Sequence, residues 1–193
     1  MTGVAVTPKA RRFWPLFCLV LLTDCATKHA AETHLLPAHV PHEFLGELVR
    51  LTLAYNPGAA MSLSLGEHSR VGFSLLALSA LLILGQLYRR TSPGDGLAAA
   101  GLALIASGAL GNLLDRLRSP RGVVDFIDVG IGDMRFWTFN VADVGITCGA
   151  ILLVLALHRA QEGRPPLRST QQAVAGPDAS TSKSLPRTLS ARS

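Results

Sequence analysis

Residues 96–114 read GLAAAGLALIASGALGNLL, and none of these 19 side chains carries a charge. A helix needs about 20 predominantly apolar residues to cross the hydrocarbon core of a bilayer. A second uncharged run, VGFSLLALSALLILGQLY, occupies residues 71–88. Both runs predict transmembrane helices and place the chain among the membrane proteins.

The overall composition agrees with a membrane protein. Of the 193 residues, 49% are hydrophobic and only 16% are charged, whereas about 25% are charged in a typical soluble domain. Two further runs, 12–31 and 139–158, are long enough to span a bilayer if the first keeps Asp24 and Lys28 and the second keeps Asp143. We therefore predict an all-α membrane protein with four transmembrane helices and a small extracytoplasmic β element.

Lysine and arginine indicate the orientation, because positively charged residues are retained on the cytoplasmic side of a membrane. They are more numerous in the segments that four spans would leave on the side of the termini, so both termini are predicted to be cytoplasmic. The tail is rich in Ser, Pro, Arg and Thr, as disordered segments often are. The predicted division is a cytoplasmic N-terminus over 1–11, a four-helix membrane domain over 12–160 with outer segments 31–70 and 117–138, and a disordered cytoplasmic tail over 161–193.

The first outer segment contains the predicted β element. Alternation over residues 48–55 predicts a strand, and Asn-Pro-Gly at 56–58 predicts a turn after it. The second outer segment contains Asp128 and Asp133, which we expect to be solvated loop residues.

Neither a metal site nor a nucleic-acid site is expected. The spacing of His34, His39 and His42 matches no well-defined metal site, and no cysteine or carboxylate cluster completes one. The net charge of +5 is distributed over the loops and the tail, whereas a nucleic-acid site needs a concentrated basic patch. We therefore expect no metal, no cofactor and no nucleic-acid partner.

Ionisable side chains inside spans need a partner or a purpose, because each costs about 2.5–3.5 kcal/mol at the centre of a helix. Asp24 and Lys28 stand four residues apart, so they lie on one helix face and can form an ion pair. The sequence leaves open whether this pair only permits insertion of the first span or also contributes to a site.

The four-span topology gathers a second group of polar residues at the outer face. They come from the end of the third span, the loop after it and the start of the fourth span: Asn112, Asp115, Arg116, Asp125, Asn140 and Asp143. Two aspartates brought close together cannot both ionise easily, so they share one proton, as in an aspartic protease. The same carboxylates could instead serve a small proton- or ion-coupled transporter, or pair for structural reasons.

Five sequence blocks occur in an order that resembles one known family. The blocks are TDCATK at 23–28, YNPGAAMS at 55–62, GALGNLLDR at 108–116, GVVDFID at 122–128 and FNVAD at 139–143. In this order across four spans they are similar to the lipoprotein signal peptidase family, also called type II signal peptidase, over roughly residues 12–158.

The resemblance implies a membrane aspartic protease that uses no metal or cofactor. Members of the family are aspartic endopeptidases of the bacterial inner membrane. They remove signal peptides from diacylglyceryl-modified prolipoproteins and cut just before the lipidated cysteine. The resemblance places the active site at the outer, periplasmic face, and it implies prolipoprotein substrates, membrane lipids and globomycin-type inhibitors as partners.

Roles for individual residues follow from the same resemblance. It implies a catalytic pair, Asp125 and Asp143, for which Asp115 is the main internal competitor because it too lies at the outer boundary. It implies substrate-binding positions at Asn56, Asn112, Arg116 and Asn140, and architectural support from Asp24, Lys28 and Asp115. Met61 stands where the family usually has an aromatic residue, and Cys25 stands where it commonly has glutamine. Both departures are expected to alter packing or substrate fit more than chemistry.

Overall fold

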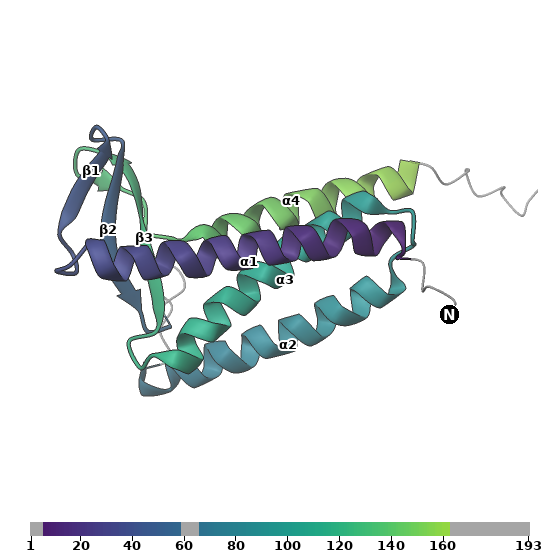
Figure 1. The fold of residues 1–193 in the computed structure, drawn as a ribbon, viewed down its shortest axis with the longest axis horizontal. Coiled ribbons are helices and arrows are strands. Elements are labelled where there is room, and N and C mark those ends of the chain that lie inside the picture. Colours follow the sequence, from purple (N-terminus) through teal and green to yellow (C-terminus); the bar gives the residue numbers. More distant parts are fainter. Residues whose placement is uncertain (1–5, 59–65, 163–193) are drawn as a thin grey trace, which may run out of the picture.

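The computed structural model describes residues 6–58 and 66–162, so Met61 and nearly all of the predicted tail lie outside the described residues. In these ranges the chain forms four long helices: α1 (Pro8–His34), α2 (Ser69–Arg90), α3 (Gly96–Arg118) and α4 (Val141–Glu162). Successive helices run in opposite directions, and the two ends of the described chain lie together, at the end of the bundle opposite a small sheet (Figure 1).

Three of these helices, α2, α3 and α4, are long and apolar enough to cross a membrane. The helix α1 has 27 residues, but Asp24 and Lys28 interrupt its apolar part. The protein is therefore a mostly helical membrane protein with three apolar helices and a small antiparallel sheet. The fourth span and the orientation of the termini stay predictions.

The helices are slightly longer than the runs predicted from the sequence. The first helix begins at Pro8 instead of residue 12, and the side chain of Thr7 accepts a hydrogen bond from its first turn. The last helix continues to Glu162. Between α2 and α3 only a short turn remains, and the side chain of Asp95 caps the start of α3.

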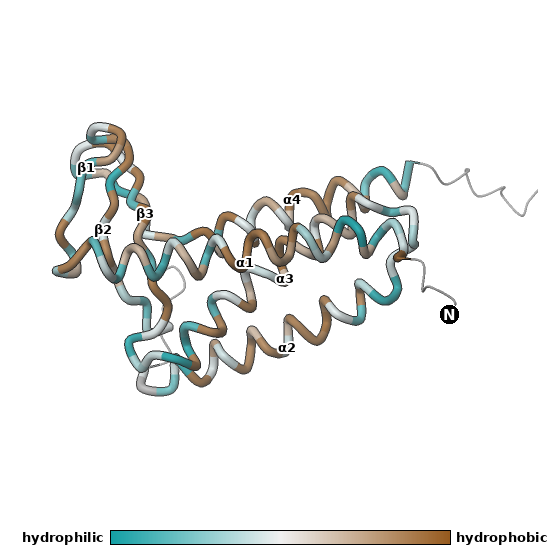
Figure 2. Tube along the Cα trace, viewed as in Figure 1, coloured by the Kyte–Doolittle hydropathy of each residue, from teal (hydrophilic) through white to brown (hydrophobic). Residues whose placement is uncertain are grey.

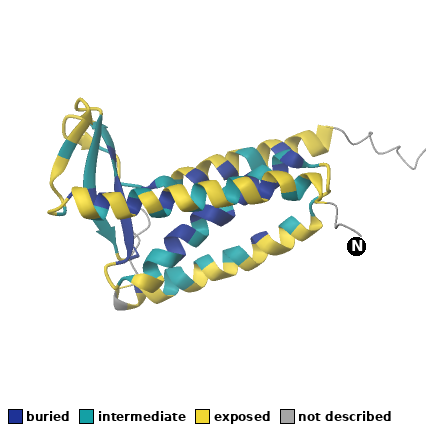
Figure 3. Ribbon diagram, in the orientation of Figure 1, coloured by how far each residue is buried: buried dark blue, intermediate teal, exposed yellow. Residues whose placement is uncertain are grey.

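The helix α3 lies at the centre of the bundle and packs against each of the other three. Its apolar window is 67% buried inside the protein, whereas that of α2 is 6% buried. Small residues permit the close packing: a Cβ atom at Gly101 would lie 2.9 Å from the backbone oxygen of Gly149 on α4. Buried residues follow α3 in Figure 3, while α2 is mostly exposed and largely apolar in Figure 2. Such an exposed apolar surface fits a helix that faces lipid.

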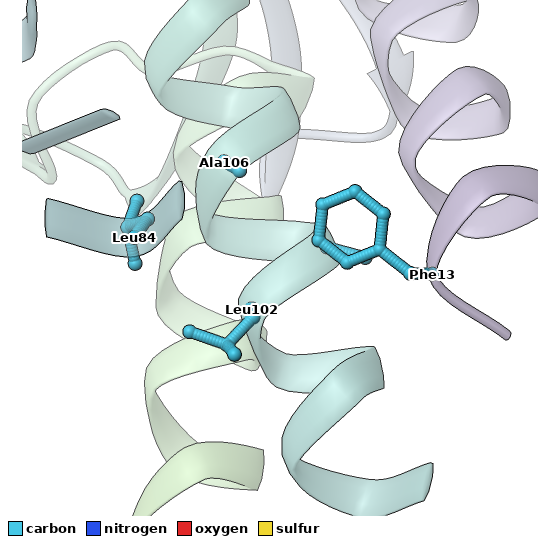
Figure 4. Packing of buried hydrophobic residues seen from close by; sticks show 5 residues of the cluster. Phe13, Leu84, Leu102 and Ala106 are labelled. Carbon is cyan, nitrogen blue, oxygen red and sulfur yellow. The ribbon is translucent and has the colours of Figure 1, made fainter. Parts of the chain in front are cut away.

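A hydrophobic cluster links the helices at the end far from the sheet. Phe13 of α1, Leu84 of α2, and Leu102 and Ala106 of α3 are buried there together (Figure 4). Because three helices contribute side chains, the cluster connects α1 and α2, which otherwise pack mainly through α3.

A four-stranded antiparallel sheet covers the other end of the bundle. Its strand order is β1 (Pro41–Leu45), β2 (Val49–Asn56), β3 (Val123–Ile131) and β4 (Met134–Arg135). The strand β2 confirms the strand predicted over 48–55, whereas β3 was not predicted. The first four residues of β3 are all buried, so the run lacks the alternation that identifies a strand with one solvated face.

The pairing of β2 with β3 brings together two outer segments that α2 and α3 separate in sequence. Asn56 lies opposite Val123, and Ala54 lies opposite Asp125. The sheet packs on the end of α1 through a cluster of buried apolar residues: Ala31, Leu35, Leu53, Val124 and Phe126. This packing fixes Asp125 above the ends of the helices.

The prediction of a solvated Asp128 was wrong. Asp128 lies in β3 and is buried, and its two carboxylate oxygens accept hydrogen bonds from Arg135 at 2.9 Å and from Thr52 at 3.1 Å. Arg135 lies on β4 and Thr52 lies on β2. The pairing therefore depends on a sheet that the local sequence did not reveal. Asp133 is exposed, as predicted.

Candidate active site

A pocket of about 530 Å³ lies where the sheet meets the ends of α3 and α4. Five of the polar residues singled out from the sequence line it: Asn56, Asn112, Arg116, Asp125 and Asp143. They come from β2, α3, β3 and α4. The fold thus gathers residues from four separate elements around one cavity.

Asp125 is held on β3 with only 4% of its surface exposed. The Asn140 side-chain N–H donates to Asp125 Oδ1 at 2.7 Å, and Asn56 also forms a hydrogen bond with the carboxyl group. Burial, together with the nearby charge of Asp143, raises the pKa of Asp125 from 3.8 to about 7. At neutral pH this carboxyl group is therefore protonated in roughly half of the molecules.

Asp143 lies in the first turn of α4 and belongs to a capping box. Its backbone N–H donates to Asn140 Oδ1 at 3.0 Å, and its Oδ2 accepts from the Asn140 backbone N–H at 3.2 Å. Such a reciprocal pair satisfies two donors at a helix N-terminus. Asn112 Nδ2 donates to the other carboxylate oxygen of Asp143 at 2.8 Å. These donors and the helix N-terminus stabilise negative charge on Asp143.

Asn140 connects the two carboxyl groups. It is fully buried, and its side-chain N–H group donates to Asp125 and, at 3.1 Å, to Asn112 Oδ1, while its own oxygen caps α4. The resemblance suggested a substrate-binding role, but this side chain is sealed behind the pocket. Its geometry favours a role in orienting the two carboxyl groups.

Arg116 adds a positive charge beside these carboxyl groups. Its guanidinium interacts electrostatically with Asp125 and Asp143 and lies over the ring of Phe73, 5.7 Å from the ring centroid. One nitrogen donates to the backbone oxygen of Asn112 at 3.1 Å. Within the described part of the chain, the buried Nε has no hydrogen-bond partner.

A second charged cluster lies behind the pocket, between α1 and α3. Lys28 Nζ lies 2.8 Å from Asp24 Oδ2 and 2.8 Å from Asp115 Oδ2. The predicted pair of Asp24 and Lys28 is therefore present, and Asp115 completes it. Asp115 lines a separate crevice of about 140 Å³ with Lys28. The geometry thus favours Asp125 over Asp115 as the partner of Asp143.

Aromatic side chains that the sequence did not single out complete the wall of the larger pocket. Tyr55, Phe136, Trp137 and Phe139 line it. Phe136 and Trp137 are more than half exposed and meet edge to face, with ring centroids 5.3 Å apart. The run FWTF at 136–139, directly before the fourth helix, is the signal that could have indicated them.

The histidines considered as metal ligands remain apart from the pocket. His34 and His39 are exposed, and His42 contacts the backbone oxygen of Leu51. Within residues 6–58 and 66–162, no group of three or more His, Cys, Asp or Glu side chains is placed to hold a metal ion.

Comparison with known proteins assigns the chain to a family. Residues 16–159 match the family described as signal peptidase (SPase) II. The chain is a member of the signal peptidase II family. The lipoprotein signal peptidase of Coxiella burnetii (strain Dugway 5J108-111) is 38% identical over 168 residues, which cover 83% of this chain and 99% of the relative. That of Moorella thermoacetica is 39% identical over 157 residues, covering 80% and 99%.

Two solved structures of bacterial membrane enzymes, both obtained by the in meso method, share the fold of this signal peptidase II. The first has a TM-score of 0.73 at 25% identity and covers 85% of this chain and 98% of its own. The second has a TM-score of 0.69 at 27% identity, covering 80% and 97%. As a member of the family, the protein is a protease that removes signal peptides from prolipoproteins in the bacterial inner membrane. The transporter interpretation is not favoured.

Proposed function

We propose that the protein is an aspartic endopeptidase that cuts diacylglyceryl-modified prolipoproteins just before the lipidated cysteine, with Asp125 and Asp143 as its catalytic pair. One observation carries the assignment. Both carboxyl groups line the same pocket, and one buried amide, that of Asn140, binds both residues. The charge of Asp143 also raises the pKa of Asp125, so the two carboxyl groups do not ionise independently.

The surroundings of the two aspartates give them different tasks. Asp143 accepts N–H groups at a helix N-terminus and is the member that carries the negative charge. Asp125 has a pKa raised to about 7 and is the member that keeps the proton. A base and an acid are thus present together near neutral pH.

The reaction follows from this division. Asp143 takes a proton from the water that attacks the scissile carbonyl carbon, while Asp125 donates its proton to the carbonyl oxygen. The resulting tetrahedral diol collapses as the C–N bond breaks. Asp143 then gives its proton to the leaving nitrogen, and Asp125 recovers a proton from a diol hydroxyl. Both carboxyl groups return to their starting state.

Other residues of the pocket supply binding and charge stabilisation. The guanidinium of Arg116 is close enough to the carboxyl pair to stabilise charge that develops on the carbonyl oxygen. Asn56 and Asn112 offer amide groups for the substrate main chain. The exposed rings of Phe136 and Trp137 offer an apolar wall for the substrate.

The proposed topology has four spans, cytoplasmic termini and an active site at the outer face. It is supported by the sheet and pocket at one end of the bundle and the chain ends at the other (Figure 1). Over the whole sequence this topology places 11 of the 18 Lys and Arg residues on the side of the termini and six on the other side, in the sense that retention of positive charge in the cytoplasm requires. The lipid chains of the substrate then stay in the bilayer while the scissile bond enters the pocket, and globomycin-type inhibitors compete for the same pocket.

The test is cleavage of a diacylated prolipoprotein peptide by the purified protein, followed by mass spectrometry of the products. We expect a single cut before the modified cysteine and no cut in a peptide without the lipid. Asp125→Asn and Asp143→Asn should each abolish the reaction. Full activity in either variant would disprove the assignment of the pair.

A further inference from the structure

The ammonium group of Lys28 is at the centre of a buried network that reaches both proposed catalytic residues. Lys28 is 3% exposed, and its Nζ lies 2.8 Å from each of three oxygens: Asp24 Oδ2, Asp115 Oδ2 and Asn112 Oδ1. The ammonium group donates a hydrogen bond to Asn112 and forms ion pairs with the two carboxylates.

The bond to Asn112 decides which way its amide group faces. The Oδ1 atom of Asn112 accepts from Lys28 at 2.8 Å and from Asn140 at 3.1 Å, so Nδ2 is directed at Asp143, 2.8 Å away. Turning the amide over would place Oδ1 against a carboxylate and Nδ2 against an ammonium group. Both contacts would then be repulsive.

The two carboxylates bound to Lys28 hold the backbone beside each proposed catalytic residue. Asp24 Oδ1 accepts the N–H of Ala142, which directly precedes Asp143, at 2.8 Å. Asp115 Oδ2 accepts the N–H of Val124, which directly precedes Asp125, at 3.3 Å. One lysine thus connects the anchors of both carboxyl groups.

We infer that Lys28 is a positioning residue for peptide cleavage: through Asn112, Asp24 and Asp115 it fixes the two catalytic carboxyl groups relative to each other. The inference rests on the proposed function. Lys28 does not line the substrate pocket, and the Asn112 N–H group that it orients is directed at Asp143, so we expect its main effect on the chemical step. Misplacement of reacting groups by about 1 Å can reduce a rate by about 10²-fold.

The inference also predicts a change in the pH profile. The charged groups that face Asp125 are Asp143 of α4, Arg116 of α3 and Lys28 of α1. The positive charge of Lys28 lowers the pKa of Asp125. Removing that charge should raise the pKa further and move the alkaline limb of the profile to higher pH.

The test compares Lys28→Met with Lys9→Met, a matched change on the same helix. Lys9 is also multiply bonded, to the backbone oxygens of Tyr88 and Thr91, but it lies at the other end of α1. For Lys28→Met we expect kcat to fall about 10²-fold, while KM stays within a few-fold of the wild-type value. The alkaline limb of its pH profile should move to higher pH. For Lys9→Met we expect an unchanged pH profile and little change in kcat.

Lys28→Met leaves the buried Asp24 and the partly buried Asp115 without their cation, which can prevent folding. The double variant with Lys28→Met and Asp115→Asn keeps the net charge of the cluster and is measured in parallel. A folded variant of either kind with wild-type kcat and an unmoved alkaline limb would overturn the inference. So would the absence of folded protein in both, because the network would then be a requirement of the fold. If the wild-type protein cuts no lipopeptide, the proposed function fails instead.

Discussion

The molecule contains two carboxylate pairs, each with one buried member, and the two pairs differ in the groups that bind them. Behind the pocket, Asp24 and Asp115 share the ammonium group of Lys28. At the pocket, Asp125 and Asp143 are held by asparagine amides and, among the described residues, have no ion-pair partner within 4.0 Å. The ammonium group offsets the repulsion between the first two carboxylates, whereas in the second pair burial and the charge of Asp143 raise the pKa of Asp125, which keeps its proton. The first arrangement is suited to holding a structure and the second to catalysis.

The largest expected difference between the two pairs is in activity. Asp143→Asn removes the proposed base and should reduce cleavage by about 10³-fold or more, because general acid–base catalysis contributes about 10²–10⁴-fold. Asp115→Asn leaves Lys28 paired with Asp24 and keeps a side-chain oxygen for the Val124 N–H, so we expect a much smaller loss of activity than in Asp143→Asn. Both variants are measured with the lipopeptide, alongside their unfolding temperatures. Equal losses of cleavage activity in the two folded variants would contradict the different roles of the two carboxylate pairs.

The next largest effect is expected at the amide that joins the pocket pair. Asn140→Ala removes the donor to Asp125 and the cap of α4 together. The loss of the helix cap should destabilise the protein by about 1 kcal/mol. The two carboxyl groups would no longer be held in place, which should reduce the cleavage rate by about 10²-fold. Steady-state kinetics and thermal unfolding of the same preparation separate the two effects. A stability loss with normal kinetics would leave Asn140 as a helix cap only.

The cleavage rate should fall as pH rises above about 7. Asp125 keeps its proton up to that pH because burial and Asp143 raise its pKa to about 7, and the ionised form cannot donate to the carbonyl oxygen. One lost proton predicts a decrease of about tenfold per pH unit on the alkaline side. The measurement is kcat/KM from pH 5 to 9 in a constant detergent. A flat profile across pH 7 would contradict the assignment of Asp125 as the acid.

Stability should show the same titration with a defined sign. The folded state keeps a proton on Asp125 that the unfolded chain releases near pH 3.8. This contribution is fully present below the unfolded pKa and is lost as pH rises through about 7, by up to about 4 kcal/mol. The unfolding temperature should therefore decrease from pH 5 to pH 8. In Asp125→Asn, the part of this decrease that comes from Asp125 should disappear.

The smallest expected effect on chemistry comes from the packing that supports both pairs. A Cβ atom at Gly108 would overlap the backbone oxygen of Ala142, next to Asp143, whereas one at Gly85 of α2 would meet nothing within 4 Å. Gly108→Ala should destabilise the protein by about 1–3 kcal/mol, and Gly85→Ala should leave it as stable or slightly more stable. Thermal unfolding of the two variants checks the difference. An unchanged unfolding temperature in Gly108→Ala would show that α3 and α4 can move apart without loss of stability.

The sequence predicted the parts of this architecture that depend on local pattern. The runs at 71–88 and 96–114 became α2 and α3, and the spacing of Asp24 and Lys28 predicted their ion pair correctly. Alternation also located β2. Each of these features follows from neighbours within one or two helical turns or along one strand.

The features that the sequence did not reveal depend on contacts between distant segments. The buried start of β3 hides its strand pattern, and without β3 the partners of Asp128 are not visible. The bonds from Lys28 to Asn112 and from Asp24 to Ala142 join helices that are far apart in the chain. Two features were available from local sequence and were overlooked: the aromatic run at 136–139 and the capping box of Asn140 and Asp143.

The central claim is that Asp125 and Asp143 share one proton near neutral pH, and direct titration of the aspartate carboxyl groups tests it. Carbon-13 NMR of aspartate-labelled protein should show one carboxyl group that titrates at about pH 7. That signal should be missing in Asp125→Asn and should move to lower pH in Asp143→Asn, where the neighbouring charge is gone. No aspartate titrating near neutral pH, or a titration that Asp143→Asn leaves unchanged, would contradict the shared proton.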